Sequence, residues 1–100
     1  MSVSSHDTDG GKSVSVVISG RFDFNDHKEF RDAYSPYAPD ASYTLDMSSA
    51  DYMDSSALGM LLLLREHAGG DKAKIKVSGC KDEIKKILTI ANFQKLFEIT

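Results

Sequence analysis

Two adjacent serines, Ser55 and Ser56, stand where a predicted strand passes into a predicted helix, and their hydroxyls are well placed for chemistry. Asp54 directly precedes them and has the side chain of a good helix N-cap. Both serines would then occupy the first helical turn, where unpaired backbone N–H groups and the helix dipole favour an anion. A phosphate there would be tolerated and would add about −1.5 to −2 charges at neutral pH. Spacing alone leaves open a structural role in which both serines only help to cap the helix.

The helix that begins at these serines has two different sides. At about 100° per residue, its apolar arc consists of Ala57, Leu58, Met60, Leu61 and Leu64. Ser55, Gly59, Leu63 and Glu66 fall on the other side, so Leu63 is not needed for the core. Gly59 costs about 1 kcal/mol relative to alanine in a helix interior and would let a second backbone approach closely. We interpret this side as a docking surface, although periodicity also allows Gly59 to pack against the protein's own sheet.

Other groups of reactive residues do not form a catalytic or metal site. Residues 11–13, Gly-Lys-Ser, resemble the end of a phosphate-binding loop, but position 6 is histidine instead of glycine and a strand follows. Residues 7–10 lack the later acidic ligands of a calcium loop, and no Gly-x-Ser-x-Gly elbow surrounds Ser55. The histidines lack metal-ligand spacing and are expected at the surface: His6, His27 and His67. We therefore expect no catalytic residue, no metal and no cofactor.

Hydrophobic patterns predict the elements that position the serines. Strands are expected over residues 2–6, 13–19, 43–47 and 74–78, with a loop over 48–53. Helices are expected over residues 28–34, 54 to about 69, and 82–91. Asn25 or Asp26 would cap the first helix, and Asn92 would end the last in a left-handed conformation. Phe93 to Ile99 supply a terminal turn or short strand. The alternation of strands and helices predicts an α/β fold with a mostly parallel sheet.

Length and composition limit the class of protein. One hundred residues, 41% of them hydrophobic, with a net charge of −3, predict one soluble domain over residues 1–100. The single cysteine, Cys80, fits a reducing cytoplasm, and the longest nearly apolar run, residues 57–64, is far shorter than the roughly 20 residues that span a bilayer. The acidic balance argues against nucleic acid as a partner. Charge is uneven, with −6 over residues 1–66 and +3 over residues 67–100.

The segment around the serines resembles the STAS family of anti-sigma-factor antagonists. Leu45-Asp46-Met47 and, after a short stretch, residues 53–59 (Met-Asp-Ser-Ser-Ala-Leu-Gly) match the central motif of that family. Residues 19–23 are similar to its early Gly-x-hydrophobic-Asp, and residues 81–99 to its C-terminal helix and closing strand. The resemblance implies a STAS-like sheet of four to five strands covered by about four helices. Ala57 departs from the pattern, because the family usually has glycine there.

The same resemblance implies roles for individual residues. The phosphorylated serine of the family directly follows the motif aspartate, which makes it Ser55 here, with Ser56 as the alternative. Asp23 matches the acidic residue that family members hold near that serine. With the helix side described above, the expected partner-binding residues are Asp23, Asp54, Ser55, Ser56, Gly59 and Leu63.

The resemblance implies a partner-switching regulator without catalysis of its own. The unphosphorylated chain would bind an anti-sigma factor or serine kinase with a GHKL-type ATPase fold, and that protein's other client would be released. Phosphorylation of Ser55 would break the complex, and a metal-dependent serine phosphatase would restore it. We expect a cytoplasmic protein, monomeric when free, that binds neither nucleic acid nor membrane.

Two other functions stay open from the sequence. STAS-like domains also serve as modules that sense nucleotides or other small ligands without a phospho-switch, although no glycine-rich cradle is visible here. An acyl- or phosphoryl-transfer enzyme would use Ser55 as its nucleophile, but no base can be identified.

Overall fold

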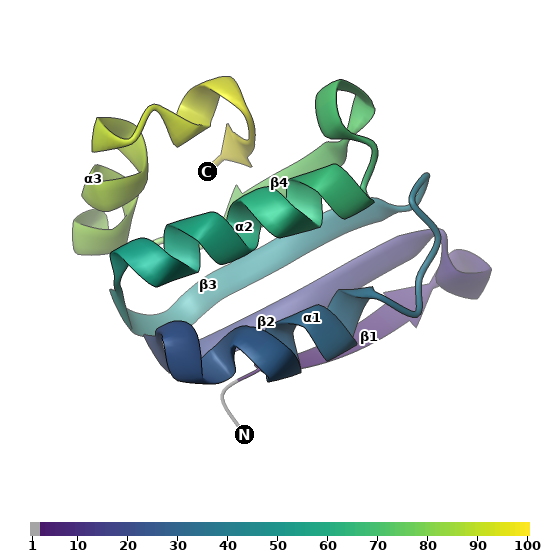
Figure 1. The fold of residues 1–100 in the computed structure, drawn as a ribbon, viewed down its shortest axis with the longest axis horizontal. Helices are drawn as coiled ribbons and strands as arrows, with labels where there is room; N and C mark the ends of the chain where they lie inside the picture. The colour runs from purple at the N-terminus through teal and green to yellow at the C-terminus, as the bar shows by residue number, and fades with distance from the viewer. Residues whose placement is uncertain (1–2) are drawn as a thin grey trace.

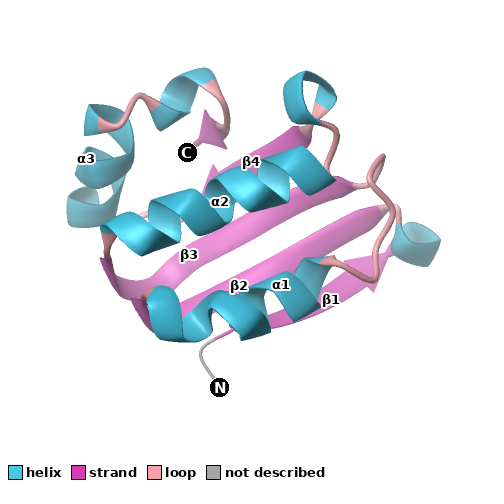
Figure 2. Cartoon of the chain, in the orientation of Figure 1, coloured by secondary structure: helices cyan, strands magenta, loops and turns pink. Residues whose placement is uncertain are grey.

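The computed structural model describes residues 3–100 and contains a five-stranded sheet with α1 and α2 across one face (Figures 1 and 2). The strands are β1 (Val3–Thr8), β2 (Ser13–Phe22), β3 (Ser42–Met53), β4 (Lys74–Ser78) and β5 (Glu98–Ile99), and the α-helices are α1 (His27–Tyr34), α2 (Ser55–His67) and α3 (Asp82–Ile90). Strand order follows the chain; β1 is antiparallel to β2, and the other neighbours are parallel. The α/β fold with a mostly parallel sheet is confirmed.

Three predicted details change. Residues 3–100 contain three α-helices instead of about four, because their other helical segments are 3-10 turns of three residues. The predicted edge strand is present from Val3, and Ser2 lies outside the described residues. The loop predicted over residues 48–53 is wrong, because β3 continues to Met53 and pairs with a longer β2. Two register shifts absorb extra residues in β3, which explains why strict alternation ends there in the sequence.

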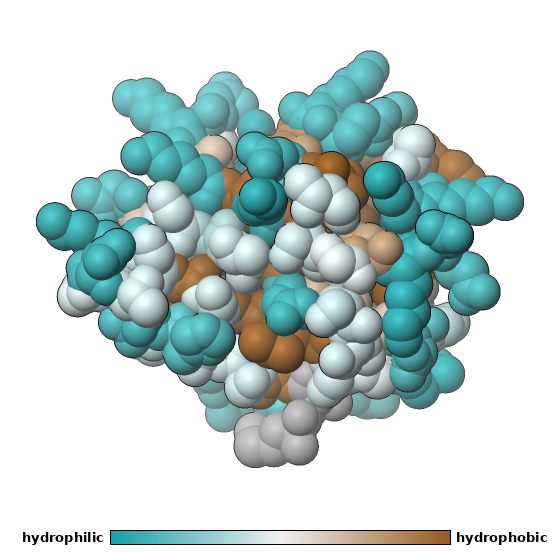
Figure 3. All heavy atoms as spheres, turned by 180° about the vertical axis from the view of Figure 1, so that it is seen from behind, coloured by the Kyte–Doolittle hydropathy of each residue, from teal (hydrophilic) through white to brown (hydrophobic). Residues whose placement is uncertain are grey.

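The core lies between the sheet and its helices. Inward residues alternate along the central strands, with Val14, Val16 and Ile18 on β2 and Tyr43, Leu45 and Met47 on β3. The helices bury Phe30 and Tyr34 from α1, Met60, Leu61 and Leu64 from α2, and Ile84 and Leu88 from α3. Among residues 3–100 no α-helix covers the opposite face, whose middle is mostly of intermediate hydropathy with hydrophobic patches and whose rim is hydrophilic (Figure 3). The predicted arc of α2 therefore faces the core, although Leu58 is only partly buried.

The carboxyl end of α2 is held by aromatic and polar contacts. The predicted surface position of His67 is wrong, since its ring is partly buried against Tyr34 and Tyr43, at centroid distances of 5.1 and 6.1 Å. His67 Nε2 lies 2.8 Å from the carbonyl oxygen of Tyr37. At the other end of the chain, Asn92 has the predicted left-handed conformation, with φ 62° and ψ 28°. The carboxyl end of α2 is thus fixed by contacts with distant residues, and the carboxyl end of α3 by a local backbone conformation.

Candidate functional site

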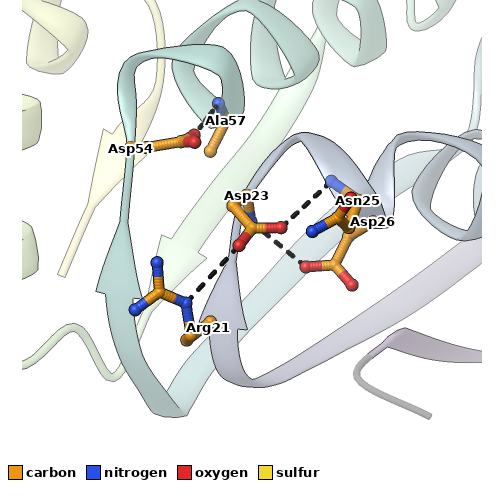
Figure 4. A network of polar contacts seen from close by, with 6 residues as sticks. All are labelled: Arg21, Asp23, Asn25, Asp26, Asp54 and Ala57. Atoms are coloured by element: carbon orange, nitrogen blue, oxygen red, sulfur yellow. Dashed lines mark hydrogen bonds and ion pairs between the residues drawn. The ribbon is translucent and has the colours of Figure 1, made fainter.

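The start of α2 is built as the sequence predicts. Asp54 is extended, with φ −104° and ψ 180°, and its carboxylate accepts a hydrogen bond of 2.9 Å from the backbone N–H of Ala57 (Figure 4). The N-cap assignment is confirmed. Ser55 and Ser56 follow in the first turn, and both are exposed. Their hydroxyls are therefore accessible at the positive end of a helix of 13 residues.

Asp23 lies at the end of the neighbouring strand. Phe22 and Met53 are partners in the parallel register, so Asp23 and Asp54 follow adjacent strand ends about 5 Å apart. The backbone N–H of Asp54 also donates to the carbonyl of Phe22 at 3.4 Å. The sheet thus places Asp23 next to the start of α2, where the two serines lie.

The Asp23 carboxylate holds the turn before α1 (Figure 4). It accepts from the backbone N–H of Asn25 at 3.0 Å and from Arg21 Nε at 3.5 Å. The backbone N–H of Asp23 donates to the buried carboxylate of Asp26 at 3.1 Å, and this bond completes a reciprocal capping box. Asp26 occupies the predicted N-cap position of α1, but its side chain makes no capping hydrogen bond to that helix, and Asp23 caps the preceding 3-10 turn. Asp23 therefore has a structural role beside any role in binding.

The outward side of α2 is open. A Cβ placed on Gly59 meets no atom within 4 Å, so the alternative that Gly59 packs against its own sheet is wrong. Leu63 is 49% exposed, as predicted from its position outside the apolar arc of the helix. The sequence reasoning missed Leu62, which is 39% exposed and follows Ser55 and Gly59 at helical spacing. We call Ser55, Ser56, Gly59, Leu62 and Leu63 the α2 surface.

Two exposed aromatic side chains near the start of α2 were also missed. Phe24 follows Asp23 directly, is 67% exposed, and stacks on His27 with ring centroids 5.9 Å apart. Tyr52 precedes the α2 turn, is 42% exposed, and has the guanidinium of Arg21 4.1 Å from its ring centroid. Neither residue belongs to the apolar side of a predicted helix or to an inward position of a predicted strand. An aromatic residue without a place in the core could therefore have been identified from the sequence as exposed. Of the six large exposed hydrophobic residues in the described chain, Leu62 and Leu63 belong to α2 and Phe24 follows the neighbouring strand end, whereas Tyr52, the partner of Arg21, points to the face opposite to Phe22 and Met53.

Polar contacts fix the strand that leads to the serines. Asp46 accepts from the hydroxyl of Ser48 at 2.6 Å and from its backbone N–H at 3.0 Å, and these bonds lower the pKa of Asp46 below its ordinary 3.8. The Asp51 carboxylate pairs with Lys81 at the start of α3. Gly79 approaches Ser48 so closely that a Cβ there would lie 2.9 Å from that of Ser48. These contacts tie β3 to the β4–α3 turn.

Residues 3–100 contain no group of three or more His, Cys, Asp or Glu side chains that could hold a metal ion. Across the same residues, we find no helix with the length and apolar character needed to cross a membrane.

Comparisons with known proteins agree with this geometry. Residues 5–98 match a family profile described as "Mlab, STAS domain". The chain is 52% identical over 91 residues to STAS-domain containing protein PA14_20770 of Pseudomonas aeruginosa (strain UCBPP-PA14), covering 90% of each chain. Its fold is similar to that of the anti-sigma factor antagonist SpoIIAA in its unphosphorylated form, with TM-score 0.74, 15% identity, and coverage of 98% of this chain and 86% of that one. The phosphorylated form of SpoIIAA, the Bacillus cell fate determinant, gives TM-score 0.68 at 12% identity, over 94% and 87% of the two chains.

Proposed function

This chain belongs to the STAS domain family, and we propose that it is a partner-switching regulator controlled by phosphorylation of Ser55. The observation that carries the proposal is an accessible serine on a capped helix start, beside exposed apolar side chains. In the unphosphorylated form these side chains bind an anti-sigma factor or serine kinase with a GHKL-type ATPase fold. The chain itself is substrate and ligand and catalyses nothing; ATP belongs to the kinase, and the metal to a serine phosphatase that reverses the switch.

The direction of the side chains favours Ser55 over Ser56. Ser55 lies on the same side of α2 as Gly59 and Leu62, and both of these residues face solvent. Ser56 is turned about 100° from Ser55, toward the side of Leu63 and of His67, which packs on α1. A phosphate on Ser55 would therefore stand at the amino-terminal end of the α2 surface, on the same side of the helix as Gly59 and Leu62.

The surface around Ser55 has the composition of a binding site. Aromatic side chains are enriched in protein interfaces, and the buried core of an interface is more apolar than the rest of the surface. Phe24 is held by a capped turn, so it loses little conformational freedom when a partner binds. The flat position at Gly59 leaves room for the backbone of that partner.

Phosphorylation would act at the interface and leave the fold unchanged. The first turn of α2 tolerates a dianion because of the helix dipole and its free N–H groups. A partner seated on the α2 surface meets that charge next to Asp54 and Asp23, and loses binding through repulsion and steric conflict. A loss of about 3 kcal/mol weakens a complex more than a hundredfold, which is enough to exchange partners.

The test combines site mapping with binding. Phosphopeptide mass spectrometry of the protein from its own cells should locate phosphate on Ser55, and Ser55→Ala should abolish that peptide. Affinity capture with wild type and Ser55→Ala should retain a protein with the GHKL-type ATPase fold, whereas Ser55→Asp should lose it. We expect this partner to meet a monomer of this chain in the cytoplasm.

Ser4→Asp supplies the matched control. Ser4 is exposed on the helix-free face, so the same change of charge there should leave capture unaffected. Equal capture by all four proteins would overturn the phospho-switch, and phosphate confined to Ser56 would move the switch to that residue.

A further inference from the structure

The helix-free face of the sheet holds a hollow at the end opposite to Ser55. Its volume is about 440 Å³ and it lies at the amino-terminal ends of β3 and β4, whereas Ser55 follows the carboxyl end of β3. A volume of this size is ordinary for a small-molecule site. The outward side chains that line it are Ser42, Thr44, Lys74, Lys76, Leu96 and Glu98.

The strand register arranges hydrogen-bond donors in a grid on this face. Ser42 is the partner of Lys74, and Thr44 is the partner of Lys76. Residues two apart on one strand point to the same face about 6.6 Å apart, and neighbouring strands lie about 4.8 Å apart. The two hydroxyls and two ammonium groups therefore surround an area that a tetrahedral oxyanion can contact from several sides. Ser13 and Ser15 of β2 extend the same two rows.

Most of these donors have no partner in the protein. Within residues 3–100, the side chains of Ser42, Thr44 and Lys74 form no hydrogen bond or ion pair. Lys76 pairs only with Glu98, at 3.6 Å, and both side chains are at least half exposed, so this pair is weak. Lys74 is thus a free cation opposite the free hydroxyl of Ser42.

The charged side chains that line the hollow are Lys74, Lys76 and Glu98, which leave one net positive charge there. The chain has a net charge of −3, but residues 67–100, which supply both lysines, carry +3. Side chains of intermediate hydropathy and some hydrophobic patches cover the middle of this face, with strongly hydrophilic side chains around the rim (Figure 3). Serine and threonine hydroxyls of the neighbouring strands match the hydroxyl groups of a carbohydrate, and Leu96 supplies an apolar wall.

We propose that this hollow binds a small sugar phosphate. Lys74 and Lys76 take the phosphate group, the hydroxyls of Ser42 and Thr44 donate to its oxygens, and the sugar lies along the serine rows of β2 and β3. The negative charge of the Glu98 carboxylate repels the phosphate group and limits the affinity of the ligand. The site is independent of Ser55, because the length of β3 separates them.

Amide NMR of the full chain, titrated with ribose 5-phosphate, tests the site. Saturable shifts should concentrate at residues 42–44 and 74–76, and neutral ribose should cause none. Lys74→Gln should weaken binding about tenfold through loss of a charge-assisted contact. Glu98→Gln should tighten binding, since it removes the opposing charge. Affinity should fall below about pH 6, where the phosphate gains a proton.

Lys86→Gln is the matched control, because Lys86 is exposed on α3 and lies outside the hollow. It should leave the affinity unchanged. Unchanged circular dichroism would show that the variants fold. The proposal is overturned if no saturable shift occurs, if ribose binds as well as its phosphate, or if Lys86→Gln weakens binding as much as Lys74→Gln.

Discussion

Alanine substitution of two neighbouring leucines should have very different effects on the free energy of unfolding, because one lies on the buried side of α2 and the other on its exposed side. Leu64 is 0% exposed and Leu63 is 49% exposed. Leu64→Ala removes buried methyl groups and leaves a cavity, which should cost about 2–5 kcal/mol of the free energy of unfolding. Leu63→Ala removes a side chain that is already half in water, and alanine is the better helix former. We therefore expect it to change that free energy by no more than about 0.5 kcal/mol.

Thermal and urea unfolding, followed by circular dichroism, measure both changes. One kcal/mol corresponds to about 4–8 °C in Tm for a domain of this size, so Leu64→Ala should lower Tm by about 10 °C or more. Leu62→Ala, at a position 39% exposed, should behave like Leu63→Ala. Leu63→Ala should also reduce capture of the partner while the fold stays intact. A loss of about 2 kcal/mol or more at Leu63 would show that this side chain belongs to the core, and would refute its role on a free binding surface.

Three further predictions concern the framework of the site. Asp54→Ala should lower the free energy of unfolding by about 1 kcal/mol through loss of the cap, whereas Asp54→Asn should retain most of it in the same urea titration. Gly79→Ala should be far more destabilising than Gly20→Ala, because both have positive φ but only at Gly79 does the new Cβ meet Ser48, at 2.9 Å; equal Tm values would contradict this. The lowered pKa of Asp46 adds stability above its ordinary value of 3.8 that is lost as pH falls through the folded value. Asp46→Asn should therefore lose less stability than wild type between pH 7 and pH 3, and parallel curves for the two proteins would exclude this contribution.

The sequence predicts the elements whose pattern is local. Alternation along residues 13–19 and the apolar arc of α2 depend on burial that repeats with a fixed period, so both are found in the structure. The Asp54 cap and the left-handed Asn92 are likewise decided within a few residues. The extension of β3 is different, because residues 48–53 become a strand only through pairing with a partner far away in sequence.

The residues of the candidate site likewise differ in whether local sequence patterns predict them. The positions of Ser55, Ser56, Gly59 and Leu63 on an exposed helix side follow from periodicity. Phe24 escapes such reasoning, because its exposure depends on how the Asp23 capping box turns the chain. The helix-free face escapes it too, since donors on different strands become neighbours only through the register.

The contact at the carboxyl end of α2 makes His67 a natural probe of the whole helix. A carbonyl oxygen only accepts, so the bond to Tyr37 requires a proton on Nε2 and selects one tautomer of the neutral ring. Nitrogen NMR of that imidazole would register any sliding of α2 against the segment that joins α1 to β3. A phosphate at the other end of the same helix should leave the signal in place if the switch is confined to the surface, and should displace it if the helix moves as a rod.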